Sequence, residues 1–339
     1  MLNSNDGGAS MKKKLTILLA LILGLMCILT GCGEEKIEPQ TVKIAALAGP
    51  TGMGMAPMIV DKPTLADGVE LDFTVATSAD QITADIINGT YQIAAVPTNL
   101  AATLYNKTDG KVILGAVNTL GTLSIVSDSG ANINSISDLK GQTIGATGQG
   151  SVPEYVLKSL LKSNGIDPDT DVTIQWYSEH AQAAAALAAG EITIAMLPEP
   201  FATTTLAQNS NLTKSIDLNT AWSDANDGQQ MEMGCIIVNK EWADNNPALV
   251  KKFMAEYKAS VETINSDTDE AAQYVVDAGI IKSAELAKKA IPNCAITFIS
   301  AQDAKKDLNG FLTTLYDYNP DSVGGSVPAE DSSFFSLSY

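Results

Sequence analysis

The sequence predicts an α/β fold of two lobes, each a mostly parallel sheet flanked by helices, with a ligand cleft between the lobes. Short apolar runs alternate with helix-like stretches and short turns, which is typical of βαβ units. This alternation runs through residues 41–124 and starts again over 125–231. The apolar run 232–238 predicts a strand that returns to the first set. We therefore assign 41–124 and 232–339, with its C-terminal helices, to lobe 1 and 125–231 to lobe 2.

Four apolar runs predict the strands of lobe 1, and the stretches between them predict its helices. The turn Gly49-Pro50-Thr51-Gly52 separates the first strand from the first helix. Ser78 is a candidate N-cap of the second helix, which ends at Asn88-Gly89. The expected strands are 42–47, 71–76, 91–96 and 112–117, and the expected helices are 53–60, 78–87 and 99–105.

Lobe 2 repeats the same pattern. Gly141 and Gly190 end two of its helices, and the run Gly148-Gln149-Gly150-Ser151 opens another. The expected strands are 124–127, 143–146, 172–176 and 192–197, and the expected helices are 136–141, 152–163, 180–189 and the stretch from Phe201 to 208. After the returning strand we expect helices at 247–264, 269–278, 284–290 and 301–318. The segment 322–338 contains Ser, Gly and Pro and is predicted to be irregular.

The N-terminal segment has the layout of an export signal. Three lysines, Lys12 to Lys14, precede an apolar stretch over 15–29 that is short for a membrane span. The run Leu-Thr-Gly-Cys that ends at Cys32 resembles the lipobox of bacterial lipoproteins, in which the cysteine thiol receives a diacylglycerol. The resemblance implies a signal peptide over 1–31, a lipid anchor at Cys32 and a flexible tether over 32–40. The alternative is an ordinary signal peptide or short anchor with an incidental cysteine, and Met11 is an alternative start.

Charge and composition narrow the ligand class. The chain has 39 acidic residues, 21 basic residues and a formal net charge of −18. Such an acidic chain argues against nucleic acid as a partner. All of the basic residues are lysines, and arginine is the usual bidentate partner of carboxylates, sulfonates and phosphates. The missing arginine therefore disfavours a strongly anionic ligand. Cys235 and Cys294 form either a disulfide or two buried thiols.

The sequence offers little for catalysis. His180 is its one histidine, at the start of an alanine-rich helix, where we expect a capping or surface role. The acidic run at 167–171 fails the calcium-loop spacing, and the glycines at 145–150 match neither a dinucleotide fingerprint nor a P-loop. We therefore expect no enzymatic activity, no cofactor and no metal.

Polar turn residues that follow strands are the candidate ligand contacts, because strand ends line the ligand crevice of open parallel sheets. Pro-Thr-Gly exposes backbone amides at a helix start, and a methionine adds adaptable apolar contact. The alternative for each polar residue is that it caps a helix without contacting a ligand. The alternative for the methionine is that it packs in the core. The candidates are Pro50, Thr51, Gly52, Met53, Ser78, Thr98, Asn99, Asn118, Thr119, Gly150 and Ser151, with Tyr177 and Glu199 as weaker ones. If Glu199 points into the cleft, it can accept a hydrogen bond from an amine.

Three segments together resemble type II periplasmic binding proteins, the solute receptors of ABC importers. They are the run at 136–146, Gly150-Ser151 at a helix start, and the alanine-rich helix and strand that precede Glu199-Pro200-Phe201. Within that class the chain is similar to the receptors for aliphatic sulfonates, nitrate and thiamine pyrimidine precursors. The resemblance implies a monomeric lipoprotein on the outer face of the cell membrane, which captures a small solute and delivers it to an ABC permease. The alternatives are a surface-anchored enzyme or a ligand sensor on the same fold.

Overall fold

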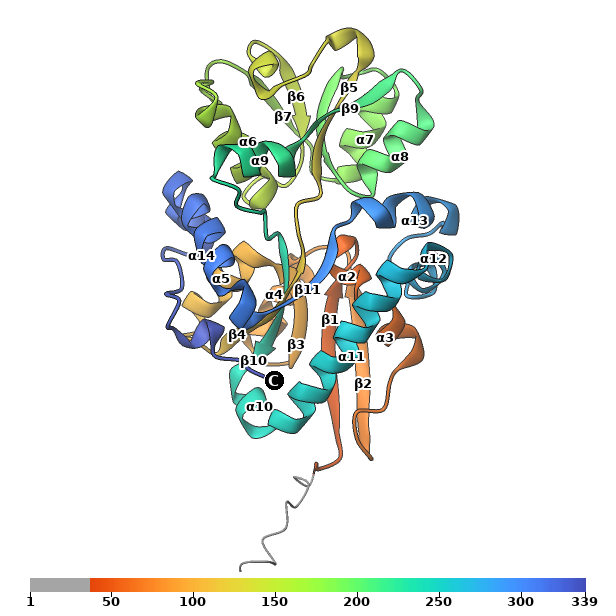
Figure 1. Cartoon of the computed structure of the whole chain (residues 1–339), viewed down its shortest axis with the longest axis vertical. Helices are drawn as coiled ribbons and strands as arrows, with labels where there is room; N and C mark the ends of the chain where they lie inside the picture. The colour runs from red at the N-terminus through yellow and green to blue at the C-terminus, as the bar shows by residue number, and fades with distance from the viewer. Residues whose placement is uncertain (1–36) are drawn as a thin grey trace, which may run out of the picture. The chain divides into compact units, whose positions relative to one another are not determined.

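Two sheets organise the chain in the computed structural model, which describes residues 37–339 (Figure 1). The first sheet has the strand order β11-β4-β10-β3-β1-β2, and the second has the order β7-β6-β8-β5-β9. We call each sheet, with the helices packed on it, a lobe. The strands of lobe 1 are β1 (Gln40–Leu47), β2 (Val69–Ala76), β3 (Ile93–Pro97), β4 (Val112–Thr119), β10 (Gly234–Asn239) and β11 (Ile296–Ser300). Those of lobe 2 are β5 (Leu123–Asp128), β6 (Thr143–Ala146), β7 (Thr173–Trp176), β8 (Ile194–Pro198) and β9 (Leu212–Asp217).

Strand direction brings the functional turns to one edge of each sheet. In lobe 1, β1 pairs in parallel with β2 and β3, while β10 runs antiparallel to β3 and β4. In lobe 2, β6 pairs in parallel with β7 and β8, while β5 runs antiparallel to β8 and β9. Both sheets are therefore mixed, with most strands pointing one way. The carboxyl ends of those strands meet at one edge, where ligands bind in open α/β sheets.

Helices connect and cover the strands. Those of lobe 1 are α2 (Pro50–Met53), α3 (Ala56–Asp61), α4 (Asp80–Ile87), α5 (Thr98–Lys107), α10 (Lys240–Asn245), α11 (Pro247–Ser266), α12 (Thr268–Asp277), α13 (Ala284–Ala290) and α14 (Ala301–Tyr318). Those of lobe 2 are α6 (Val152–Ser163), α7 (His180–Ala188), α8 (Phe201–Gln208) and α9 (Leu218–Ala225). Short 3-10 turns occur at Ser129–Ala131, Ile136–Leu139, Ile291–Asn293, Pro320–Val323 and Ser333–Phe335. Among residues 37–339, no helix is both long and apolar enough to cross a bilayer.

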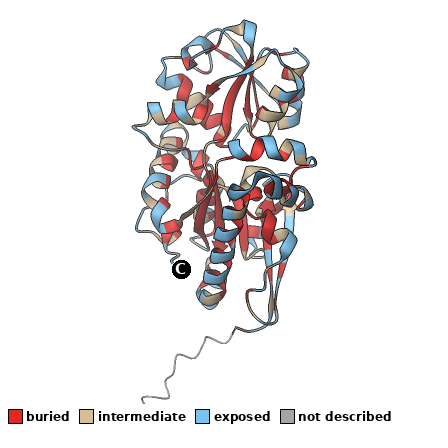
Figure 2. Ribbon diagram, turned by 45° about the vertical axis from the view of Figure 1, so that its right-hand side comes forward, coloured by how far each residue is buried: buried red, intermediate tan, exposed pale blue. Residues whose placement is uncertain are grey.

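The core lies between the sheets and their helices, as Figure 2 shows by the buried strands and the exposed outer helix faces. Every residue of β4 is buried. The C-terminal segment is irregular, as predicted, yet Phe334 and Phe335 at its end are buried in the same core. That segment is therefore fixed to lobe 1 by its aromatic side chains.

The predicted α/β class and the alternation of strands and helices are confirmed, with several local corrections. The helix expected at 53–60 is two helices that break at Gly54. Ser260 donates its hydroxyl proton to the Gly54 carbonyl at 2.7 Å, and a Cβ on Gly54 would lie 2.8 Å from the Tyr257 hydroxyl. Close packing against α11 therefore sets the break. Ser78 is not the N-cap of α4, since that helix begins after Ala79 and has no side-chain cap.

Other elements were not predicted because their local pattern is weak. Strand β9 buries only Ile216, so it has no apolar run to mark it. Strand β11 has five residues and lies at a sheet edge between two helices. Helices α9 and α10 are also additional to the prediction. The open question of the two cysteines is answered, because Cys235 and Cys294 are both buried free thiols.

The lobe boundaries and the export segment remain predictions. Residues 1–31 and Cys32 lie outside the described residues, as does most of the expected tether. Its last residue, Gln40, is already the first residue of β1, and its side chain bonds to Trp242 and Asn246.

Candidate functional site

A cavity of ≈210 Å³ lies where the strand ends of the two lobes face each other. The lobe 1 side comes from the ends of β1, β3 and β4 and the start of β10; the lobe 2 side comes from the starts of α6, α7 and α8. The lining residues from lobe 1 are Leu47, Ala48, Gly49, Pro50, Thr51, Pro97, Thr119 and Met233. Those from lobe 2 and its connection are Thr122, Leu123, Gly148, Ser151, Val152, Pro153, His180, Pro198, Glu199, Pro200 and Phe201.

The lobe 1 wall depends on the turn between β1 and α2. The amides of Gly52 and Met53 donate to the Gly49 carbonyl at 3.0 and 3.1 Å. Asn118, at the end of β4, donates its side-chain amide to the Thr51 carbonyl at 2.9 Å. A Cβ on Gly52 would lie 2.0 Å from the Leu47 carbonyl oxygen, so only glycine allows this close approach. The turn therefore presents Pro50 and Thr51 to the cavity in a fixed position.

Helix starts form much of the lobe 2 wall. Ser151 is the N-cap residue of α6 and donates its hydroxyl proton to the Gly148 carbonyl at 2.7 Å. The Gly150 amide donates to the Glu154 carboxylate at 2.6 Å. In α7 and α8 the third amide of the first turn is already used, because Gln182 donates to the Glu179 carbonyl and Thr203 to the Glu199 carboxylate. The amides before them have no partner within their own helices. These helix starts can therefore donate hydrogen bonds to carbonyl or hydroxyl oxygens of a ligand.

His180 and Phe201 supply ring surface to the cavity. Their ring centroids are 5.3 Å apart at an interplanar angle of 41°. His180 Nδ1 shares a hydrogen bond with the Thr147 hydroxyl. Burial lowers the pKa of the His180 imidazole, with the neighbouring Glu179 acting weakly in the other direction. Because the ordinary pKa is already below 7, the imidazole is neutral at pH 7 and acts as an uncharged ring.

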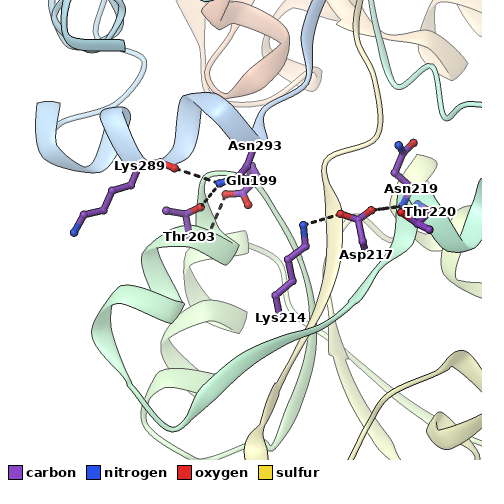
Figure 3. Close-up of polar contacts among 8 residues, drawn as sticks. All are labelled: Glu199, Thr203, Lys214, Asp217, Asn219, Thr220, Lys289 and Asn293. Carbon is purple, nitrogen blue, oxygen red and sulfur yellow. Dashed lines mark hydrogen bonds and ion pairs between the residues drawn. The ribbon is translucent and has the colours of Figure 1, made fainter.

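Glu199 is the one carboxylate of the cavity lining in the described part of the chain. Glu199 is buried, with 4% of its surface exposed to solvent. Its Oε2 accepts a hydrogen bond from the Thr203 amide at 3.2 Å. Burial raises the pKa of this carboxyl group, while the Thr203 hydrogen bonds and the charge of Lys214 act in the opposite direction. Figure 3 shows Lys214 turned to Asp217, which it contacts at 2.7 Å. Among the residues that the structure describes, Glu199 therefore has no cationic partner in direct contact, and a ligand can supply one.

The structure brings five of the predicted residues together at the cavity: Pro50, Thr51, Thr119, Ser151 and Glu199. The others lie behind or away from the lining. Gly52 and Met53 are buried beneath the turn, Ser78 is exposed, and Gly150 precedes α6.

The remaining candidates have contacts that fix the fold. Thr98 donates to the Glu232 carbonyl, and Asn99 donates to the Ser322 carbonyl at 3.1 Å. Asn118 supports the Thr51 turn, as described above. The Tyr177 hydroxyl accepts from the Gln175 amide at 2.8 Å, on the side of β7. Their ligand roles remain predictions.

Sequence reasoning overlooked several lining residues, above all His180, Phe201 and Met233. His180 and Phe201 begin helices that follow strand ends, so the rule that selected Thr51 and Ser151 also points to them. Met233 precedes β10, an antiparallel strand whose amino end lies at the same edge as the carboxyl ends of its neighbours. Its place depends on strand direction, which no local pattern in the sequence shows.

A second hollow lies entirely on lobe 2 and has a different character. Its volume is ≈570 Å³, and it is lined by mostly polar residues around Asn134, Asn164, Asp217 and Asp224. It is more open to solvent and has no contribution from lobe 1, so the smaller cavity between the lobes is the better site for an enclosed solute. In the part of the chain that the structure describes, no three His, Cys, Asp or Glu side chains are grouped so as to hold a metal ion.

Known proteins share this fold. The family model described as "ABC transporter, phosphonate, periplasmic substrate-binding protein" matches residues 63–278. A crystal structure of an ABC transporter from Parabacteroides distasonis is 25% identical, with a TM-score of 0.73, and the match covers 87% of this chain and 98% of that chain. No curated protein sequence matches the chain significantly.

Two other solved structures show likeness of fold alone. The periplasmic aliphatic sulphonate binding protein SsuA from Escherichia coli is 15% identical, with a TM-score of 0.69, and the match covers 85% of this chain and 91% of that chain. The nitrate-binding protein NrtA from Synechocystis PCC 6803 is 15% identical, with a TM-score of 0.60, and 84% of each chain is covered. These findings confirm the resemblance to solute-binding proteins of ABC importers and the two-lobed fold.

Proposed function

Since the chain belongs to the family of periplasmic substrate-binding proteins of phosphonate-type ABC transporters, we propose that it captures a small solute between its lobes and delivers it to a membrane permease. The family is extracytoplasmic and serves transport. We further propose that the mature protein is held at the outer face of the membrane by a lipid on Cys32. It acts without catalysis, as a monomer, and the lobes close around the solute.

The chemistry of the cavity supports a ligand that is neutral or cationic. Among residues 37–339, no lysine lines the cavity, whereas the buried carboxylate of Glu199 does. A sulfonate, phosphonate or nitrate would meet this carboxylate with no charged partner to offset it. This single observation, one carboxylate and no cationic side chain in the lining formed by residues 37–339, carries the proposed ligand class.

Size and shape restrict the solute further. A volume of ≈210 Å³ equals that of about seven water molecules in the liquid, which suits a compound built on one small ring. Phe201 and the neutral His180 offer ring faces, while Pro50, Pro97 and Pro198 offer apolar contact. We therefore propose a small heterocycle with an amino group or a protonated ring nitrogen, which donates to Glu199.

A thermal-shift screen tests the proposal. The panel contains amino-substituted pyrimidines, amino acids, flavins, phosphonates, sulfonates and nitrate. Saturation at one hundred times Kd stabilises a protein by about 2.7 kcal/mol, which raises the melting temperature by about 4 °C for a chain of about 300 residues. We expect that rise with an aminopyrimidine and no rise with phosphonate, sulfonate or nitrate. A rise with the anions alone would overturn the proposed ligand class, and no rise with any compound would count against solute capture.

The matched variants are Glu199→Gln and Glu191→Gln. The first keeps the shape of the side chain but removes its charge, and a hydrogen bond to a charged group is worth about 1.5–3 kcal/mol. We expect Glu199→Gln to weaken aminopyrimidine binding by about 10- to 150-fold in calorimetric titration. Glu191 is exposed in the same lobe and outside the cavity lining, so its variant should bind like the wild type.

A further inference from the structure

Two different kinds of contact join the lobes, one on each side of the cavity. On one side, α14 of lobe 1 packs against α6 of lobe 2 and reaches Trp222 of α9 (Figure 1). Phe311 and Trp222 meet edge to face with ring centroids 5.3 Å apart, and both side chains are fully buried. Nearby, the Lys162 ammonium lies 4.4 Å from the ring centre of Tyr318. Separating these side chains would expose large apolar surfaces, so this side resists opening.

On the other side, α13 of lobe 1 approaches α8 of lobe 2, and the 3-10 turn Ile291–Asn293 that follows α13 makes a polar contact with α8. The side-chain amide of Asn293 donates to the Thr203 hydroxyl oxygen at 3.4 Å and to the Lys289 carbonyl at 3.2 Å. Asn293 is exposed and Thr203 is half-buried. Water can replace such a contact at small cost, so this side is the one that can open.

The polar contact continues into the ligand site. Figure 3 shows Thr203 joined to both Asn293 and Glu199, with the Thr203 amide bonded to the Glu199 carboxylate at 3.2 Å. Thr203 thus accepts from lobe 1 through its hydroxyl group and donates to the cavity carboxylate through its backbone.

We propose that Asn293 is a positioning residue, whose contact with Thr203 is made whenever the lobes are closed, with or without a ligand, and fixes Glu199 for the ligand. The proposal rests on the proposed function, because it assigns a role to Glu199 in binding. In this account α14 remains packed against lobe 2 as a pivot, while the contact between Asn293 and Thr203 breaks on opening. Closure and ligand recognition are then coupled through three residues.

Hydrogen exchange of the Thr203 amide, measured on the ligand-free protein, tests the contact directly. A neutral hydrogen bond is worth about 0.5–1.5 kcal/mol, which corresponds to about a 2- to 13-fold change in an equilibrium. We expect Asn293→Ala and Thr203→Val each to speed exchange of this amide by that factor, with the double variant no faster than either single one. Thr203→Ser keeps the hydroxyl group and should restore the wild-type rate.

Asn245→Ala is the matched control. Asn245 also donates to the carbonyl four residues earlier, that of Glu241, at 2.9 Å, but it lies at the end of α10. Exchange at Thr203 that is equally fast in the wild type, Asn293→Ala and Asn245→Ala would overturn the proposal. So would additive effects of the two single variants, or a failure of Thr203→Ser to restore the rate.

Titration with 4-aminopyrimidine tests the coupling to the ligand. We expect Asn293→Ala to weaken binding by about 2- to 13-fold in the wild type and by a smaller factor in the Glu199→Gln background. Equal weakening in both backgrounds would refute the positioning role. If the wild type does not bind the probe, the proposed ligand class fails, while the exchange experiment still decides whether the closure contact exists.

Discussion

Replacing Glu232 with glutamine should change how stability depends on pH. Glu232 lies in the second connection between the lobes, just before β10. It is 2% exposed, and its Oε2 has no hydrogen-bond partner among the described residues. Burial, with a smaller contribution from the charge of Asp307, raises its pKa from the ordinary 4.5 to about 8. The folded protein therefore holds a proton on Glu232 at pH 7 that the unfolded chain releases.

The size of the effect follows from linkage. Between pH 4.5 and 8 the folded state binds this proton and the unfolded state does not, so the stability due to protonation is lost as pH rises. The loss is about 1.4 kcal/mol per pH unit, or about 4 kcal/mol from pH 5 to 8. Glutamine cannot ionise. The stability of Glu232→Gln relative to the wild type should therefore increase by up to about 4 kcal/mol over that range.

Urea unfolding of the ligand-free protein at pH 5, 6, 7 and 8 measures this difference. Glu70→Gln is the control, because Glu70 is exposed on β2 and its substitution removes one carboxylate without changing the interior. Parallel pH profiles for the wild type and Glu232→Gln would refute the reasoning. They would mean that Glu232 is hydrated or paired in solution.

Three further predictions concern the interior and the cavity. Cys235 and Cys294 are free thiols whose pKa values are raised by burial. A thiol reagent at pH 8 should therefore leave both unmodified in the native protein and react with both in denaturant. Rapid labelling of the native protein would contradict their burial. Phe311→Ala should destabilise the protein by about 3–5 kcal/mol in urea unfolding, because Phe311 is fully buried against Trp222. Phe201→Ala should destabilise the protein less than Phe311→Ala but weaken ligand binding more, since Phe201 is half-buried at the cavity. Equal stability losses would argue against this division of roles.

The sequence predicts the repeated α/β pattern well because most central strands contain a continuous apolar run, as in β3 and β8. Strand β6 and helix α6 have the predicted bounds, Thr143–Ala146 and Val152–Ser163. The edge strands β9 and β11 escape prediction because tertiary pairing, rather than an apolar run, makes them strands. The break at Gly54 depends on Tyr257 and Ser260, about 200 residues away in the sequence.

The site is predictable in part for a related reason. Strand ends place Thr51 at the edge of the first sheet and Ser151 and Glu199 at the edge of the second, since parallel strands of one sheet end together. The same rule also selects Thr98 and Asn99, whose side chains are used within lobe 1. The relative orientation of the two sheets determines which side of each helix start faces the cavity. Contacts between the lobes, such as Trp222 with Phe311, set that orientation. No local pattern carries that information.

Native mass spectrometry of the protein, purified gently from the cell that makes it, tests the central claim most directly. The account predicts a bound compound of low mass in the wild type that is neutral or cationic when released, and that is much reduced in Glu199→Gln but retained in Glu191→Gln. An anionic compound, or one retained equally by both variants, would contradict the assignment of the cavity between the lobes as its binding site.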